Sequence, residues 1–73
     1  MTPFQQRQLT ARRDALLPEW ELRIEKVKRM RIALGIETGV AVKFQLEQQL
    51  LAEDGKLSDL AAELEEVDRK LSQ

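Results

Sequence analysis

The chain contains neither cysteine nor histidine. Without thiols it has no disulfide framework, and without both residue types the usual zinc, haem and thiol-nucleophile sites are absent. We therefore expect no metal and no cofactor, and cysteine usage does not indicate a redox compartment.

Long hydrophobic runs are also missing, and only 4% of the residues are aromatic. No apolar stretch approaches the roughly 18 residues that a membrane span needs, and residues 1–7 lack the apolar core of a signal peptide. We therefore expect a cytoplasmic protein that does not enter membranes.

Charge and helix-forming residues are abundant instead. Charged residues make up 34% of the 73 residues, a composition typical of coiled coils and long helices. Residues 1–36 carry eight basic and four acidic side chains, whereas residues 37–73 carry four basic and nine acidic ones. Opposite charge on the two halves favours antiparallel pairing of two helices, although each surface ion pair adds little stability. Two independently solvated faces are the alternative.

The first half has the signals of one long helix with a single complication. Thr2 and Pro3 are a hydroxyl N-cap and a proline at the first helical position. Pro18 lacks the N–H that a helix interior needs, so the helix should either kink there or stop near Leu16 and restart at Pro18. We favour a kinked or interrupted long helix. Spacings of three and four residues define the expected seam of this helix, and Arg31 is its one polar member. The seam residues are Leu17, Trp20, Ile24, Val27, Arg31 and Leu34.

The second half shows a seven-residue repeat more clearly, with Glu53 as its single polar exception. The repeat passes Gly55 without a change of phase, so we predict a continuous helix, although an interior glycine costs about 1 kcal/mol relative to alanine. Breaks at both Pro18 and Gly55, giving a compact bundle of shorter helices, are the alternative. The apolar seam positions of this half are Leu46, Leu50, Leu57, Leu60, Leu64, Val67 and Leu71.

Thr38-Gly39 is the one strong break between the two halves. A reversal there predicts an all-α fold, an antiparallel, coiled-coil-like two-helix hairpin. We expect a helix over residues 3–36, a turn over 37–40 and a helix over 41–72, in a single domain of residues 1–73.

The hairpin also predicts which residues face each other. Antiparallel neighbours joined by a short turn should have residue numbers that sum to roughly 77. This register places Val27 near Leu50, and it puts Arg13 within reach of Glu63 or Glu66.

No pattern of catalytic residues accompanies these helices. The carboxylates of Glu63, Glu65, Glu66 and Asp68 are scattered around a helix surface. Their spacing predicts a solvated acidic face rather than an acid–base or metal cluster. We therefore expect no enzymatic activity.

The basic stretch of residues 26–31 is the one candidate for contacts with phosphate. Nucleic-acid binding usually brings a net-basic domain or stacking aromatics, and neither accompanies this stretch in a chain of pI near 5.4. Binding of nucleic acid or another polyanion through the first helix is therefore the alternative rather than the leading interpretation.

Several large apolar side chains fall outside the expected seam. Phe44 and Leu51 form a second stripe, seven residues apart, and Met30 flanks the seam on the first helix. Two helices cannot cover so many, so we expect a further helix from a second copy or from a partner protein. The leading prediction is a protein–protein interaction or oligomerisation module, and a structural coiled-coil spacer is a second alternative. The expected contact residues are Lys26, Arg29, Met30, Lys43, Phe44 and Leu51.

The segment around the break resembles a known class of small helical modules. The resemblance lies in the run Arg29–Thr38 followed by Val42–Leu50, and it covers roughly residues 20–70. Similar sequences are the effector-associated domains of multidomain bacterial conflict and signalling proteins, which sit beside caspase-like or trypsin-like peptidases, TIR domains or NACHT-type ATPases. The resemblance implies an adaptor that couples effector and sensor components through protein contacts.

Overall fold

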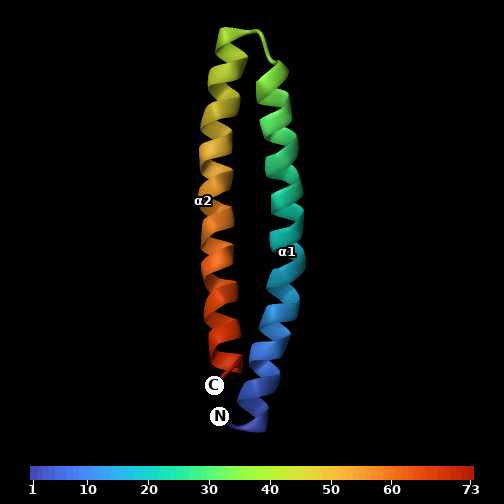
Figure 1. Ribbon diagram of the computed structural model, residues 1–73, viewed down its shortest axis with the longest axis vertical. Coiled ribbons are helices and arrows are strands. Elements are labelled where there is room, and N and C mark those ends of the chain that lie inside the picture. The colour runs from blue at the N-terminus through green and yellow to red at the C-terminus, as the bar shows by residue number, and fades with distance from the viewer.

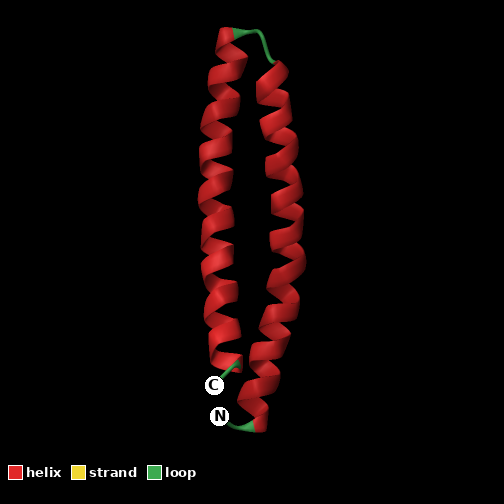
Figure 2. Cartoon of the chain, in the orientation of Figure 1, coloured by secondary structure: helices red, strands yellow, loops and turns green.

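The computed structural model describes all 73 residues, and they form a hairpin of two helices. α1 spans Pro3–Ile36 and α2 spans Val40–Leu71. The helices run antiparallel and side by side, so both chain ends lie at the same end of the molecule (Figure 1), and only a short loop joins them (Figure 2). The hairpin is 56 Å long and 15 by 13 Å across. The predicted all-α antiparallel hairpin is confirmed, and α2 begins and ends one residue earlier than expected.

α1 begins with a capping box. Thr2 Oγ1 accepts a hydrogen bond from the Gln5 backbone N–H at 3.1 Å, and the Gln5 side chain accepts one from the Thr2 N–H at 3.0 Å. Pro3 occupies the first helical position, where an N–H is not needed. The sequence predicted the threonine cap but not the returning bond to Gln5. Together the two bonds satisfy N–H groups that a helix start otherwise leaves unpaired.

α1 continues through Pro18 without interruption. The predicted alternative, a helix that stops near Leu16 and restarts at Pro18, is therefore wrong. Figure 1 shows instead that α1 is bowed, with its N-terminal turns leaning toward the C-terminal end of α2. Leu16 and Trp20, on either side of the proline, are both half-buried. Burial of these two side chains favours a continuous helix and offsets part of the cost of the hydrogen bond that the proline cannot make.

α2 likewise continues through Gly55, as the unbroken repeat predicted. The alternative of a compact bundle of shorter helices is wrong. The backbone at Gly55 does not have a positive φ, and a Cβ added there would have no neighbour within 4 Å. Gly55 thus costs the helix about 1 kcal/mol relative to alanine without a steric need inside its own chain.

The chain reverses at residues 37–39, where the side chain of Glu37 turns back to the start of α2. Glu37 Oε1 accepts a hydrogen bond from the Gly39 N–H at 2.9 Å. A carboxylate is favourable here because the first N–H groups of a helix are unpaired and carry the positive end of its dipole. A Cβ on Gly39 would lie 3.2 Å from that same oxygen, so the glycine leaves room for the contact.

The helices pack along a single seam. On α2 every predicted seam position is buried or half-buried, and Glu53 is buried among them. On α1 the inward-facing series has alternating spacings of four and three residues. Its members are Leu16, Trp20, Arg23, Val27, Met30 and Leu34.

The α1 series differs in part from the predicted one. Leu17 is 37% exposed and Arg31 is exposed, whereas Arg23 is half-buried. Positions 17 and 31 lie one residue, or about 100°, around the helix from positions 16 and 30, which face α2. Ile24 is half-buried at the flank of the seam. The hairpin itself was predicted despite this shift because three positions belong to both series: Trp20, Val27 and Leu34.

Candidate interaction surfaces

Glu53 is the one charged residue buried in the hairpin, and two cations of α1 hold it. Its carboxylate accepts hydrogen bonds from Arg23 Nη1 at 3.1 Å and from Lys26 Nζ at 3.0 Å, and the residue is only 7% exposed. The hydrogen bond from Lys26 lowers the pKa of Glu53 from its ordinary value of 4.5, against the opposing effect of burial, and the charges of Lys26, Lys56 and Arg23 add to it. The ionised carboxylate therefore forms a charged layer within an otherwise apolar seam.

Only one of the three residues of this charged layer was assigned to the seam from the sequence. Glu53 was identified as the polar exception of its series, but Arg23 was not assigned to the seam and Lys26 was assigned to a contact surface. A charged layer fixes the register of two helices, because a slip would leave Glu53 buried without its cations.

Three further ion pairs cross between the helices at their exposed edges. They place cations of α1 against carboxylates of α2, which accounts for the opposite charge of the two halves. Arg13 was expected to reach Glu63 or Glu66, but it forms its ion pair with Asp68. Glu63 pairs with Arg12 instead. The pairs are Arg12–Glu63 (2.9 Å), Arg13–Asp68 (3.0 Å) and Arg31–Asp54 (2.9 Å).

Three of the predicted contact residues, Lys26, Arg29 and Met30, line one open groove. The groove has a volume of about 400 Å³ and is also lined by Leu22 and Leu46. Met30 is half-buried and belongs to the seam, so its predicted place outside the seam is wrong. Lys26 is held by Glu53. Arg29 has the most exposed side chain of the three, at 80%, and its ion pair, with Glu25 of the same helix, is long at 3.8 Å.

The other three predicted contact residues, Lys43, Phe44 and Leu51, lie on α2. Phe44 is 60% and Leu51 66% exposed, and both face away from α1. Lys43 and Phe44 line a groove of about 550 Å³ beside the turn, together with Val40 and Glu47. The six predicted residues therefore form two groups on different helices rather than one patch.

Further exposed apolar side chains lie on α1 and at the start of α2, and they were not among the expected contact residues. Leu22 and Ile36 are 14 residues apart, which places them on one face of α1 out of phase with the seam. That spacing was a signal for an apolar outer face of α1. The side chains are Leu22 (74% exposed), Ile32 (66%), Ile36 (78%) and Val40 (85%).

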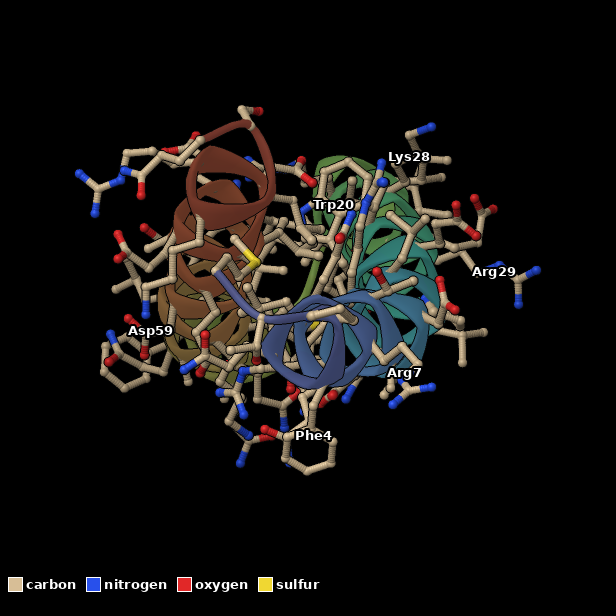
Figure 3. The ribbon with its side chains drawn as sticks, turned by 90° about the horizontal axis from the view of Figure 1, so that it is seen from below. Phe4, Arg7, Trp20, Lys28, Arg29 and Asp59 are labelled. Carbon is tan, nitrogen blue, oxygen red and sulfur yellow. The ribbon has the colours of Figure 1, made fainter.

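Seen along the hairpin, the interior is thin. Trp20 lies between the two helices, whereas Phe4 and Arg29 point outward from α1 and Asp59 points outward from α2 (Figure 3). Only six of the 73 residues are buried. Seven large apolar side chains between residues 22 and 51 therefore lie on the surface.

Neither helix has a stretch of the length and apolar character required to cross a bilayer. The acidic residues do not form a group that could hold a metal ion. No protein-family model, curated protein or solved structure matches the chain.

Proposed function

We propose that the hairpin is a non-enzymatic protein–protein interaction module, an adaptor that offers the outer faces of its helices to other proteins. The observation that carries the proposal is the exposure of large apolar side chains on those faces. Patches of this kind, rimmed by charged residues, are typical of interaction sites. The side chains, all at least 60% exposed, are Leu22, Ile32, Ile36, Val40, Phe44 and Leu51.

The small core supports the same proposal. Two helices of this length with only five buried apolar residues are marginally stable alone. Full burial of one large apolar side chain contributes about 1.5–3 kcal/mol. A helix of another molecule that covers several of them therefore both binds the hairpin and stabilises its fold.

Binding to a polyanion is the weaker interpretation because most cations of α1 are engaged. Five of them lie within 3.1 Å of a carboxylate of α2, so a phosphate backbone would have to displace those contacts. The five cations are Arg12, Arg13, Arg23, Lys26 and Arg31.

A passive coiled-coil spacer explains the seam but leaves the outer apolar residues unexplained. A spacer needs charged or polar side chains on its solvent faces, since exposed apolar stripes invite association. Phe44 and Leu51 lie on such a face. Together with the resemblance of residues 20–70 to effector-associated domains, this favours a cytoplasmic adaptor that couples effector and sensor components of a bacterial immune or signalling protein.

The test is direct binding with matched surface variants. Wild-type hairpin, Phe44→Gln/Leu51→Gln and Leu22→Gln/Ile32→Gln are immobilised and exposed to an extract of the organism that encodes the chain. Every captured protein, including further copies of the chain, is then purified and its affinity measured separately.

We expect a partner that binds wild type directly and loses at least about tenfold in affinity for one of the two variants. Circular dichroism should show unchanged helix content in both variants, because the replaced side chains are exposed. A partner that binds both variants as well as wild type would contradict the proposal. Binding of RNA or DNA alone, weakened by salt, would favour the polyanion interpretation instead.

A further inference from the structure

A second series with alternating spacings of four and three residues runs along α2, on the face away from α1. We call it the outer stripe. That spacing is the one by which one helix packs against another, and the outer stripe is separate from the seam. Every member is exposed in the hairpin. The members are Phe44, Gln48, Leu51, Gly55, Ser58 and Ala62.

Side-chain size divides the outer stripe into two halves. The half nearer the turn holds the large residues Phe44, Gln48 and Leu51, and the other half holds only small ones. When the stripe is turned end for end, each large residue therefore meets a small one. Packing improves when large and small residues alternate across a helix interface.

Within the outer stripe, no contact inside the hairpin explains why position 55 is a glycine. A glycine inside a helix weakens it, and here neither a positive φ nor a neighbour within 4 Å requires one. A side chain from another molecule that packs directly on the backbone at this point would require it.

We propose that a second copy of this chain docks on the outer stripe, antiparallel, about a two-fold axis level with residue 53. The inference rests on the interaction role proposed above and specifies the partner. Phe44 then lies over Ala62 of the second copy, Gln48 over Ser58 and Leu51 over Gly55, and the two-fold axis repeats each layer. The paired segment is about 27 Å long at a rise of 1.5 Å per residue.

Charges beside the outer stripe fit this arrangement. Lys43 and Glu65 both lack an oppositely charged group within 4.0 Å in their own chain. They lie on the same flank of the stripe near its opposite ends, and antiparallel packing brings like flanks together. Lys43 of each copy therefore comes within reach of Glu65 of the other.

Asp54 is the one group that the axis brings near its own counterpart. Both of its carboxylate oxygens accept hydrogen bonds from Arg31 of the same chain, at 2.9 and 3.0 Å. The guanidinium groups offset the repulsion between the two carboxylates. In the dimer α1 stays on the outside, so Leu22, Ile32 and Ile36 remain available to a different protein.

Sedimentation equilibrium of the whole chain over a wide concentration range tests the register. Wild type is expected to be a reversible dimer. Gly55→Gln is expected to raise the dimer Kd at least about tenfold, because the new side chain occupies the site of Leu51 in both symmetric layers. The matched control is Gly35→Gln, since Gly35 also has open space around it but lies on α1. The control should leave the dimer Kd unchanged, and helix content should not fall in either variant.

Cysteine crosslinking tests which residues face each other, because the chain has no native cysteine. A mixture of Leu51→Cys and Gly55→Cys chains should form the mixed disulfide faster than either chain alone forms its own. A disulfide needs Cα atoms within about 4.4–6.8 Å, which the proposed layer provides for residues 51 and 55 of different copies.

Charge reversal gives a third readout. Lys43→Glu and Glu65→Lys should each raise the dimer Kd, and the double variant Lys43→Glu/Glu65→Lys should restore it. A dimer that Gly55→Gln does not weaken, or equal crosslinking in all mixtures, would overturn the inference. A wild-type chain that stays monomeric yet binds a different protein through Phe44 and Leu51 would also overturn it, while leaving the proposed interaction role intact.

Discussion

Arg23 of α1 meets Glu53 of α2 inside the seam, with Arg23 Nη1 3.1 Å from Glu53 Oε2. Both side chains sit at positions where a coiled coil normally places apolar residues. The hairpin therefore lacks apolar packing at this layer. The ion pair favours one alignment of the two helices, because any other would separate Arg23 from Glu53.

Removal of one partner from this layer should destabilise the hairpin, whereas removal of both should not. Glu53→Leu is expected to lower Tm by several degrees, because Arg23 is left half-buried without its carboxylate. Arg23→Leu/Glu53→Leu is expected to recover or exceed the wild-type Tm, since two leucines fill the layer. Thermal unfolding followed by circular dichroism measures both. An equal loss of Tm in the single and the double variant would show that Arg23 and Glu53 do not depend on each other.

Acid should weaken the hairpin through the same carboxylate. The pKa of Glu53 is lowered from 4.5 in the folded chain, chiefly by its hydrogen bond with Lys26. A depressed pKa contributes stability that is fully present above the unfolded value and is lost as pH falls through the folded value. The Tm advantage of wild type over Glu53→Gln should therefore be constant near neutral pH and shrink below about pH 4.5. A gap that stays constant down to about pH 3 would contradict this assignment.

Leucines of the seam and of the outer face should respond differently to truncation. Leu60 is 9% exposed, and Leu60→Ala is expected to cost about 2–5 kcal/mol of unfolding free energy. Leu22 is 74% exposed, and Leu22→Ala should change that free energy by no more than about 0.5 kcal/mol. Urea unfolding at one fixed chain concentration gives both values. A large loss for Leu22→Ala would mean that the outer face of α1 is covered in solution.

Pro18→Ala should make the hairpin more stable and α1 straighter. An interior proline removes one backbone hydrogen bond and costs a helix about 3 kcal/mol. α1 has already adapted by bowing, so we expect a gain of up to about that size, seen as a rise in Tm and slower amide exchange around residues 14–18. A lower Tm would indicate that the bow is needed for packing of Leu16 and Trp20.

The α2 side of the seam was predictable because leucine or valine fills nearly every inward position in one unbroken repeat. The α1 side was ambiguous. The predicted and the observed α1 series each contain five apolar residues and one arginine, which is Arg31 in the first and Arg23 in the second, so apolar content does not select between them. The choice depends on Glu53, which lies on the other helix and binds Arg23.

The expected contact residues were also easier to place on α2 than on α1. Phe44 and Leu51 were correctly expected outside the seam because they are out of phase with its strict repeat. Met30 was placed outside the seam because the predicted α1 series ran through Arg31, whereas the observed series runs through Met30. Pairing between Arg12, Arg13 and the carboxylates of α2 depends on the reach of long side chains, which residue spacing does not specify.

The short turn also sets the order in which the hairpin closes. The Arg31–Asp54 contact joins residues 23 apart in sequence, whereas the Arg12–Glu63 contact joins residues 51 apart. Contacts close in sequence need less loop-closure entropy, so we expect pairing to begin at the turn and to spread toward the chain ends. By the same gradient we expect the open end to fray first. The apolar side chains around the turn, including Ile36 and Phe44, would then belong to the part of the molecule that folds earliest and opens last.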